Sequence, residues 1–134
     1  MKLKRKLASM ALAGGLAMTG LAATATPASA VGGCEANTLC LYRSTQYRTM
    51  SFAAKSTSAC FDLDDYGLTY PSNGINSYVN NLPVKATLYH SEPTGWFAMS
   101  TIRSGGFSSN TGALTSDGHW YRYSEKICTG SATP

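Results

Sequence analysis

Four cysteines have the types and spacing that most clearly indicate chemistry, and all four follow residue 30: Cys34, Cys40, Cys60 and Cys128. An even number of cysteines indicates disulfides when a protein reaches an oxidising compartment, which the first 30 residues predict below. A zinc site is the alternative, but the spacings lack paired Cys-x-x-Cys knuckles. Three pairings are possible. We favour Cys34–Cys40, which closes a tight loop. The accompanying Cys60–Cys128 bond then ties the last strand to the middle of the chain and constrains the unfolded state more.

No residue pattern indicates catalysis. His90 and His119 are the only histidines, and nothing in the sequence places either one beside an activated serine, as nucleophilic catalysis requires. Glycoside hydrolysis needs two carboxyl groups about 5 to 9.5 Å apart in a cleft. No pattern indicates that arrangement for Glu35, Glu92 or Glu125. We therefore expect a protein that is not an enzyme.

The acidic residues Asp62, Asp64 and Asp65 form a single cluster between Phe61 and Tyr66. Such a cluster could hold a metal ion, but a solvated loop is the preferred interpretation. Asp62 and Asp64 occupy alternate positions, which a strand would point the same way.

Aromatic side chains are numerous, and all 14 of them follow residue 30. Aromatic residues favour strands and cores, which is the default interpretation here. An exposed subset could instead bind carbohydrate or another protein.

Short strands must position these side chains. Residues 39–42, 50–54 and 84–89 alternate in the manner of half-buried strands, and residues 96–102 and 120–123 are rich in β-favouring types. No segment after residue 30 has sustained helical spacing. Turn residues separate the strands at Asn73-Gly74, Pro93-Thr94-Gly95, Gly105-Gly106 and Asp117-Gly118. The pattern predicts an all-β sandwich or barrel.

The first 30 residues have the pattern of a secretory signal peptide. Four basic residues up to Lys6 precede an apolar run over residues 7–23, which at 17 residues is short of the roughly 20 needed to span a bilayer. Ala28-Ser29-Ala30 then predicts cleavage between Ala30 and Val31 and release of an extracellular protein. Lipidation at Cys34 is disfavoured because this residue lies well beyond the apolar run.

Removal of residues 1–30 changes the charge of the protein. Seven of the 11 Lys and Arg residues and all seven Asp and Glu residues lie after residue 30, so the mature chain has no net charge. No basic excess remains to attract nucleic acid or anionic lipid. We expect a monomer that binds neither nucleic acid nor membrane, with one domain over residues 31–128 and a flexible tail over residues 129–134.

An internal repeat is visible in the mature chain. Leu41-Tyr42 recurs 47 positions later as Leu88-Tyr89, each time at the end of an alternating segment. The recurrence predicts two copies of a four-stranded unit that pack face to face, because neither copy could bury its apolar face alone.

A longer set of motifs carries a family resemblance: Cys34, Cys40-Leu41-Tyr42, Tyr47, Cys60-Phe61-Asp62-Leu63, Ile75-Asn76-Ser77-Tyr78-Val79-Asn80-Asn81 and Leu88-Tyr89. Over roughly residues 34–96 the chain resembles the secreted actinobacterial proteins related to the Streptomyces metalloproteinase inhibitor. The resemblance implies a βγ-crystallin-like sandwich of two Greek-key motifs, held here by disulfides. It also implies inhibition of an extracellular peptidase, although no segment matches the family's protease-contacting loop.

The resemblance includes two departures at the first hairpin of each copy. Crystallin-type motifs have a second aromatic residue five positions after the first and a glycine two positions later. Tyr42 and Tyr47 keep the aromatic pair, but Thr49 stands at the glycine position. In the second copy Thr94 replaces the second aromatic residue, and Gly95 comes one position early.

Crystallin-like domains often bind calcium through a short polar loop, and residues 72–77 are the nearest equivalent. Asn73 and Ser77 match the pattern, whereas Ser72 and Asn76 do not. Calcium prefers several oxygen ligands that include carboxylates, and this loop has none, so no cofactor is expected. A calcium-binding or structural module of the cell envelope remains the alternative to a peptidase inhibitor.

Overall fold

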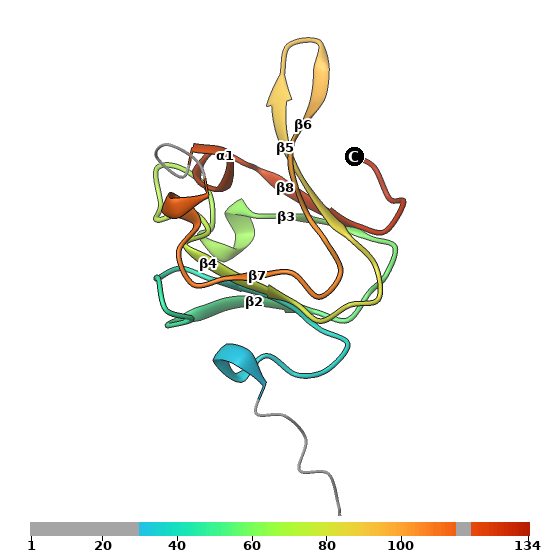
Figure 1. The fold of residues 1–134 in the computed structure, drawn as a ribbon. Helices are drawn as coiled ribbons and strands as arrows, with labels where there is room; N and C mark the ends of the chain where they lie inside the picture. The colour runs from blue at the N-terminus through green and yellow to red at the C-terminus, as the bar shows by residue number, and fades with distance from the viewer. Residues whose placement is uncertain (1–29, 115–118) are drawn as a thin grey trace, which may run out of the picture.

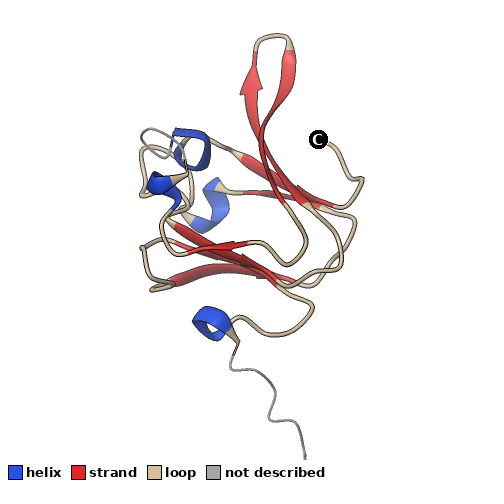
Figure 2. Ribbon diagram, viewed as in Figure 1, coloured by secondary structure: helices blue, strands red, loops and turns tan. Residues whose placement is uncertain are grey.

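The computed structural model describes residues 30–114 and 119–134 as two antiparallel sheets, each of four strands (Figures 1 and 2). The predicted signal peptide, except Ala30, and the predicted turn at Asp117-Gly118 lie outside the described residues. No helix within the described ranges is long and apolar enough to cross a membrane.

The first sheet has the order β2-β1-β4-β7 and the second has the order β3-β8-β5-β6. The strands of the first sheet are β1 (Leu39–Tyr42), β2 (Met50–Ala54), β4 (Ser77–Asn80) and β7 (Phe107–Ser108). Those of the second sheet are β3 (Cys60–Asp62), β5 (Ala86–Glu92), β6 (Gly95–Ile102) and β8 (Lys126–Thr129). The all-β prediction is confirmed.

The two halves of the chain, β1 to β4 and β5 to β8, have the same connectivity. In each half the first strand lies between the second and the fourth, and the third strand joins the opposite sheet. The repeated Leu-Tyr pairs fall on the equivalent first strands, β1 and β5. Each predicted copy is therefore not a separate sheet, because β3 and β7 are exchanged between the sheets.

The apolar core lies between the sheets and draws on both. Leu39 and Leu41 of β1 meet Leu88 of β5 and Ile127 of β8 there, all fully buried. The alternate residues of β1, Cys40 and Tyr42, form a second buried cluster with Cys34 and Val79 on the other face. Because successive side chains of β1 point to opposite faces, this strand contributes to two buried clusters. The second cluster packs against the segment before β1, which includes Cys34.

Both predicted disulfides are present. Cys34 is bonded to Cys40, and Cys60 is bonded to Cys128. The second bond links residues that face each other in the register of β3 and β8. It therefore joins the exchanged strand of the first half to the last strand of the second half.

The strand predicted over residues 120–123 is wrong. This segment forms a short helix, α1 (His119–Arg122), and the prediction of no helix is corrected here. Tyr121 of α1 is buried and stacks on Tyr78 with ring centroids 5.6 Å apart. The backbone carbonyls of Tyr121 and Arg122 accept hydrogen bonds from Ile75 and Tyr70. These tertiary contacts override the weak strand preference of the aromatic residues.

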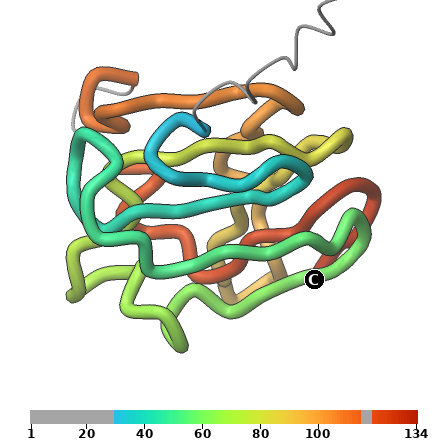
Figure 3. Tube along the Cα trace, turned by 90° about the horizontal axis from the view of Figure 1, so that it is seen from below, coloured from blue at the N-terminus to red at the C-terminus, as the bar shows by residue number. Residues whose placement is uncertain are grey.

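Three single-turn 3-10 segments complete the structure: η1 (Val31–Gly33), η2 (Asp64–Tyr66) and η3 (Thr111–Ala113). Residues 129 and 130, at the end of β8, lie beside residues 57–59 (Figure 3). Thr129 is buried as the last residue of β8, and the backbone N–H of Gly130 donates to the carbonyl of Lys85 at 2.8 Å. The start of the predicted flexible tail is therefore part of the folded domain.

The turn after β1 forms although threonine stands at the glycine position. Thr49 has φ +59°, the left-handed backbone that glycine adopts most easily. Its carbonyl accepts a hydrogen bond from the backbone N–H of Arg43 at 3.0 Å, which closes the turn. The hydrogen bonding of this turn thus holds Thr49 in a left-handed conformation that residues other than glycine disfavour.

We predict that the free energy of unfolding falls at alkaline pH because of two buried tyrosines. Burial raises the pKa of Tyr42 and, more strongly, of Tyr78, and the neighbouring phenols of Tyr47 and Tyr121 add to the respective effects. The unfolded chain therefore loses these protons first as the pH passes about 10, and the free energy of unfolding then falls by at most about 1.4 kcal/mol per pH unit for each tyrosine. Denaturant unfolding between pH 8 and 11 measures the slope. Tyr78→Phe should reduce the slope, and an unchanged slope would contradict the assignment.

Candidate functional site

The end of the β5–β6 hairpin projects from the sandwich (Figure 1). The last residue of β5 that pairs with β8 is Tyr89, whereas pairing with β6 continues to Glu92 and Gly95. A register shift between Leu88 and Tyr89 marks a bulge at the same level, and bulges bend and twist a strand. The hairpin therefore leaves the sheet as a two-stranded ribbon, exposed throughout residues 91–98.

Two aromatic side chains are the most prominent features of this ribbon. Trp96 is 41% exposed and Phe97 is 58% exposed. Neighbouring residues of a strand point to opposite faces, so the ribbon carries one aromatic residue on each face. At the tip, Gly95 has φ +125°, a conformation that side chains strongly disfavour.

Contacts with the chain just before and within β8 hold the base of the ribbon. A carboxylate oxygen of Glu125 accepts a hydrogen bond from the backbone N–H of Ser91 at 2.6 Å. The Nζ atom of Lys126 lies 4.9 Å from the ring centroid of Trp96 and 2.7 Å from Oδ1 of Asp62. An isolated hairpin is marginally stable in water, so these contacts position the ribbon.

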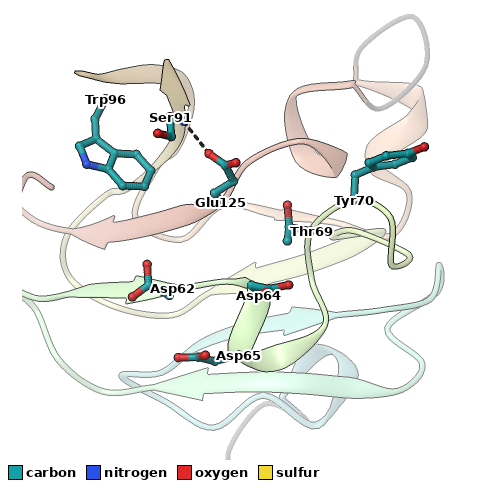
Figure 4. A pocket seen from close by; sticks show the side chains of 8 residues that line it. All are labelled: Asp62, Asp64, Asp65, Thr69, Tyr70, Ser91, Trp96 and Glu125. Atoms are coloured by element: carbon teal, nitrogen blue, oxygen red, sulfur yellow. Dashed lines mark hydrogen bonds between the residues drawn. The ribbon is translucent and has the colours of Figure 1, made fainter. Parts of the chain in front are cut away.

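An open groove of about 540 Å³ lies at the foot of the hairpin (Figure 4). Three separate segments supply its walls. The first runs from the end of β3 through η2 to Tyr70, the second is the β5–β6 hairpin, and the third is Glu125, the residue before β8. The lining residues are Asp62, Asp64, Asp65, Thr69, Tyr70, Ser91, Trp96 and Glu125.

Carboxylates dominate the electrostatics of this groove. Asp62 is paired with Lys126. The carboxylates of Asp64 and Asp65 have neither a hydrogen bond nor an ion pair among the described residues. The solvated loop predicted for this cluster therefore coincides with one wall of the groove. The strand ends at Asp62 and η2 begins at Asp64, so the two residues do not share one strand.

The Nδ1 atom of His90 lies beside the groove, 3.1 Å from the carbonyl oxygen of Tyr123 and 3.4 Å from Oε2 of Glu125. Because a carbonyl only accepts hydrogen bonds, this contact places a hydrogen on Nδ1. The other histidine, His119, packs against Tyr123 with ring centroids 4.6 Å apart. Both rings thus contact the segment that leads into β8.

The three glutamates considered for catalysis lie in different parts of the molecule. Glu125 lines the groove, and Glu92 lies at the hairpin tip. A carboxylate oxygen of Glu35 lies 2.8 Å from Nζ of Lys55. The hydrogen bond from Lys55 is the larger cause, and the lysine charge the smaller cause, of a lowered pKa of the Glu35 carboxyl. The structure brings no two of these carboxylates into one cleft among the described residues.

The residues of the predicted calcium loop differ in their surroundings. Asn73 is exposed, whereas Ser77 is fully buried. The Ser77 hydroxyl donates to the carbonyl of Ser44 at 2.6 Å and accepts from the backbone N–H of Tyr47 at 3.1 Å. Its hydrogen bonds thus hold the turn after β1. Within the described residues, no group of three or more His, Cys, Asp and Glu side chains is placed to hold a metal ion.

Sequence reasoning identified the Asp cluster and the aromatic residues but did not join them into one site. Asp62 and Glu125 are 63 positions apart in the chain, and the pairing of β3 with β8 brings their segments together. Comparisons with protein-family models, curated proteins and solved structures found no match to the chain. Chemically, the groove offers hydrogen-bond acceptors and negative charge, while the ribbon above it offers aromatic contact area.

Proposed function

We propose that the chain is a secreted, non-catalytic protein that inhibits extracellular peptidases through the ribbon formed by residues 91–98. The observation that carries this proposal is the exposure of both faces of a hairpin whose base is held by Glu125 and Lys126. A contact loop ordered before binding loses little conformational entropy in the complex. The resemblance to secreted metalloproteinase inhibitors supports a peptidase as the partner.

The strand order supports the finer proposal for the fold. In a Greek key the fourth strand returns to lie beside the first, which gives the order 4-1-2-3. The orders β4-β1-β2 and β8-β5-β6 follow this rule, with the third strand of each half in the opposite sheet. We propose two Greek-key motifs of crystallin type on this basis.

Secretion is the setting that the disulfides favour. All four cysteines are paired, and such bonds persist in oxidising compartments. Export with cleavage between Ala30 and Val31 would supply that environment. N-terminal sequencing of the protein recovered from the culture medium tests this cleavage site directly.

Alanine at both aromatic positions of the ribbon is expected to abolish inhibition. Aromatic hot-spot residues contribute about 2 kcal/mol or more each to binding, so Trp96→Ala with Phe97→Ala should weaken inhibition by roughly 1,000-fold. The assay titrates the purified, oxidised protein against thermolysin-type and subtilisin-type peptidases. Near-UV circular dichroism verifies that the variant is folded.

Phe107→Ala provides the matched control because Phe107 is 61% exposed but lies in β7 of the other sheet. Its inhibition should equal that of the unaltered protein. Equal loss in both variants would contradict a contact made by the ribbon. If the unaltered protein leaves both peptidase classes active at high molar excess, the proposed function is wrong.

A structural crystallin-like module of the cell envelope is the second candidate, and the strand order alone favours it. Calorimetry with calcium separates its metal-binding form from the inhibitor. Heat of binding and a rise in melting temperature would support calcium at the loop of Asn73 and Ser77. Their absence would leave a module without metal.

A further inference from the structure

We propose that the groove at the foot of the hairpin binds the ammonium or guanidinium group of a basic polypeptide. The inference goes beyond peptidase inhibition, because the groove has a ligand chemistry of its own and shares only Ser91 and Trp96 with the ribbon. A protein that inhibits no peptidase could still bind such a ligand, and an inhibitor could lack the site.

The first argument is a buried hydroxyl without a partner. Thr69 lines the groove and is only 6% exposed. Its hydroxyl has no hydrogen bond within the described residues. Burial of an unsatisfied hydroxyl is destabilising, so a ligand that bonds to it would relieve that penalty. Figure 4 shows Thr69 between Glu125 and Tyr70, in the middle of the groove.

The charges beside Thr69 select the sign of the ligand. Asp64 and Asp65 are without a hydrogen bond or ion pair among the described residues, and Glu125 adds a third carboxylate whose Oε2 is engaged by Ser91. Carboxylates accept hydrogen bonds and attract cations. The groove therefore suits a group that is positively charged and rich in N–H donors.

Lys126 provides an internal example of this recognition. Its side chain is mostly buried, and the Nζ atom lies 2.7 Å from a carboxylate oxygen of Asp62 and 4.9 Å from the ring centroid of Trp96. Contact of a cation with an aromatic face adds to the attraction of the carboxylate. Two lining residues of the groove, Asp62 and Trp96, thus already hold an ammonium group in the arrangement that we infer for the ligand.

A polypeptide fits better than an amino sugar. Sugars stack on open aromatic faces, but Tyr70 is stacked on Tyr123 with ring centroids 5.1 Å apart, and Lys126 covers one face of Trp96. The adjoining β6 is an edge strand of its sheet. Its outer backbone groups can pair with an extended polypeptide, as edge strands commonly do.

The experiment titrates the oxidised secreted protein with trilysine at low ionic strength and follows backbone amide shifts by NMR. Shifts should concentrate at residues 62–70 and 125. Asp64→Asn combined with Asp65→Asn should weaken binding by about tenfold or more, as expected for the loss of charge-assisted hydrogen bonds. Glu35→Gln removes one carboxylate far from this groove and should leave the affinity unchanged.

Substitutions at Thr69 test the specific geometry. Thr69→Val keeps the shape and removes the hydroxyl, so trilysine should bind several-fold more weakly while the melting temperature of the free protein rises. Thr69→Ser keeps a hydroxyl and should retain binding.

Three outcomes would overturn the proposal. The first is no binding of trilysine at low salt. The second is equal affinity in the Thr69→Val variant, which would leave only a diffuse acidic surface. The third is groove-dependent binding of a glucosamine trimer in the absence of trilysine binding, which would assign the groove to carbohydrate. None of these measurements involves a peptidase, so failure here is distinct from failure of the inhibitor proposal.

Discussion

Removal of the Cys60–Cys128 bond by alanine at both positions should lower the free energy of unfolding by about 4 kcal/mol. The bond closes a loop with a sequence separation of 68 residues, and a long loop restricts the unfolded chain strongly. In the folded state β3 pairs with β8 through only three residues. The bond therefore reinforces a short strand pairing and the Lys126–Asp62 ion pair in attaching the exchanged strand of the first half. Denaturant unfolding followed by tryptophan fluorescence measures the loss.

The other disulfide is the matched control. Cys34–Cys40 has a sequence separation of only 6 residues, so its removal should cost about 2 kcal/mol on the same model. Three of the four cysteines are almost fully buried, so both double variants also leave small cavities. The difference between the two variants thus reports loop length. Equal losses would show that local packing, rather than restriction of the unfolded chain, determines the contribution of each bond.

Features of this fold that depend on neighbouring residues could be predicted from the sequence. β1 and β2 lie at the residues predicted for them, although β1 is buried on both faces rather than half-buried. The tight disulfide Cys34–Cys40 follows from proximity in the chain. In these segments the local preference and the tertiary environment favour the same structure.

Apart from the Cys60–Cys128 bond, the features that depend on distant contacts could not be predicted. The exchange of β3 and β7 between the sheets could not be predicted, because β3 has only three residues and β7 only two, too few to show a pattern. The helix α1 forms where aromatic residues favour a strand, because stacking of Tyr121 on Tyr78 and backbone bonds to the loop before β4 determine its conformation. Pairwise contacts between remote segments override propensity in both cases.

The candidate site shows the same division. The acidic cluster and Trp96 are recognisable by type, but their shared groove arises from the pairing of β3 with β8 and of β8 with β5. Thr69 carries no sequence signal at all. Its importance comes from burial without a hydrogen bond, which is a property of the folded chain alone.

Asn80→Ala should destabilise the fold by about 3 kcal/mol or more, because buried backbone groups left without partners cost about 1 to 3 kcal/mol each. Asn80 is fully buried at the end of β4. Its Nδ2 donates to the carbonyls of Val84 at 3.0 Å and Arg103 at 3.1 Å, and its Oδ1 accepts from the backbone N–H of Leu82 at 3.1 Å. One amide thus joins the first sheet, the linker between the halves and the end of β6. Thermal and denaturant unfolding measure the effect.

Asn80→Asp separates hydrogen bonding from shape. The introduced carboxylate has almost the shape of the amide but presents acceptors to carbonyl acceptors, so burial should raise the pKa of the introduced carboxyl group. This variant should be more stable at pH 4 than at pH 7, because its stability is lost as the pH rises through that pKa. Asn73→Ala, at an exposed position, should change stability by less than about 0.5 kcal/mol. A tolerated Asn80→Ala would show that the linker, and with it the register of the two halves, is held by the core alone.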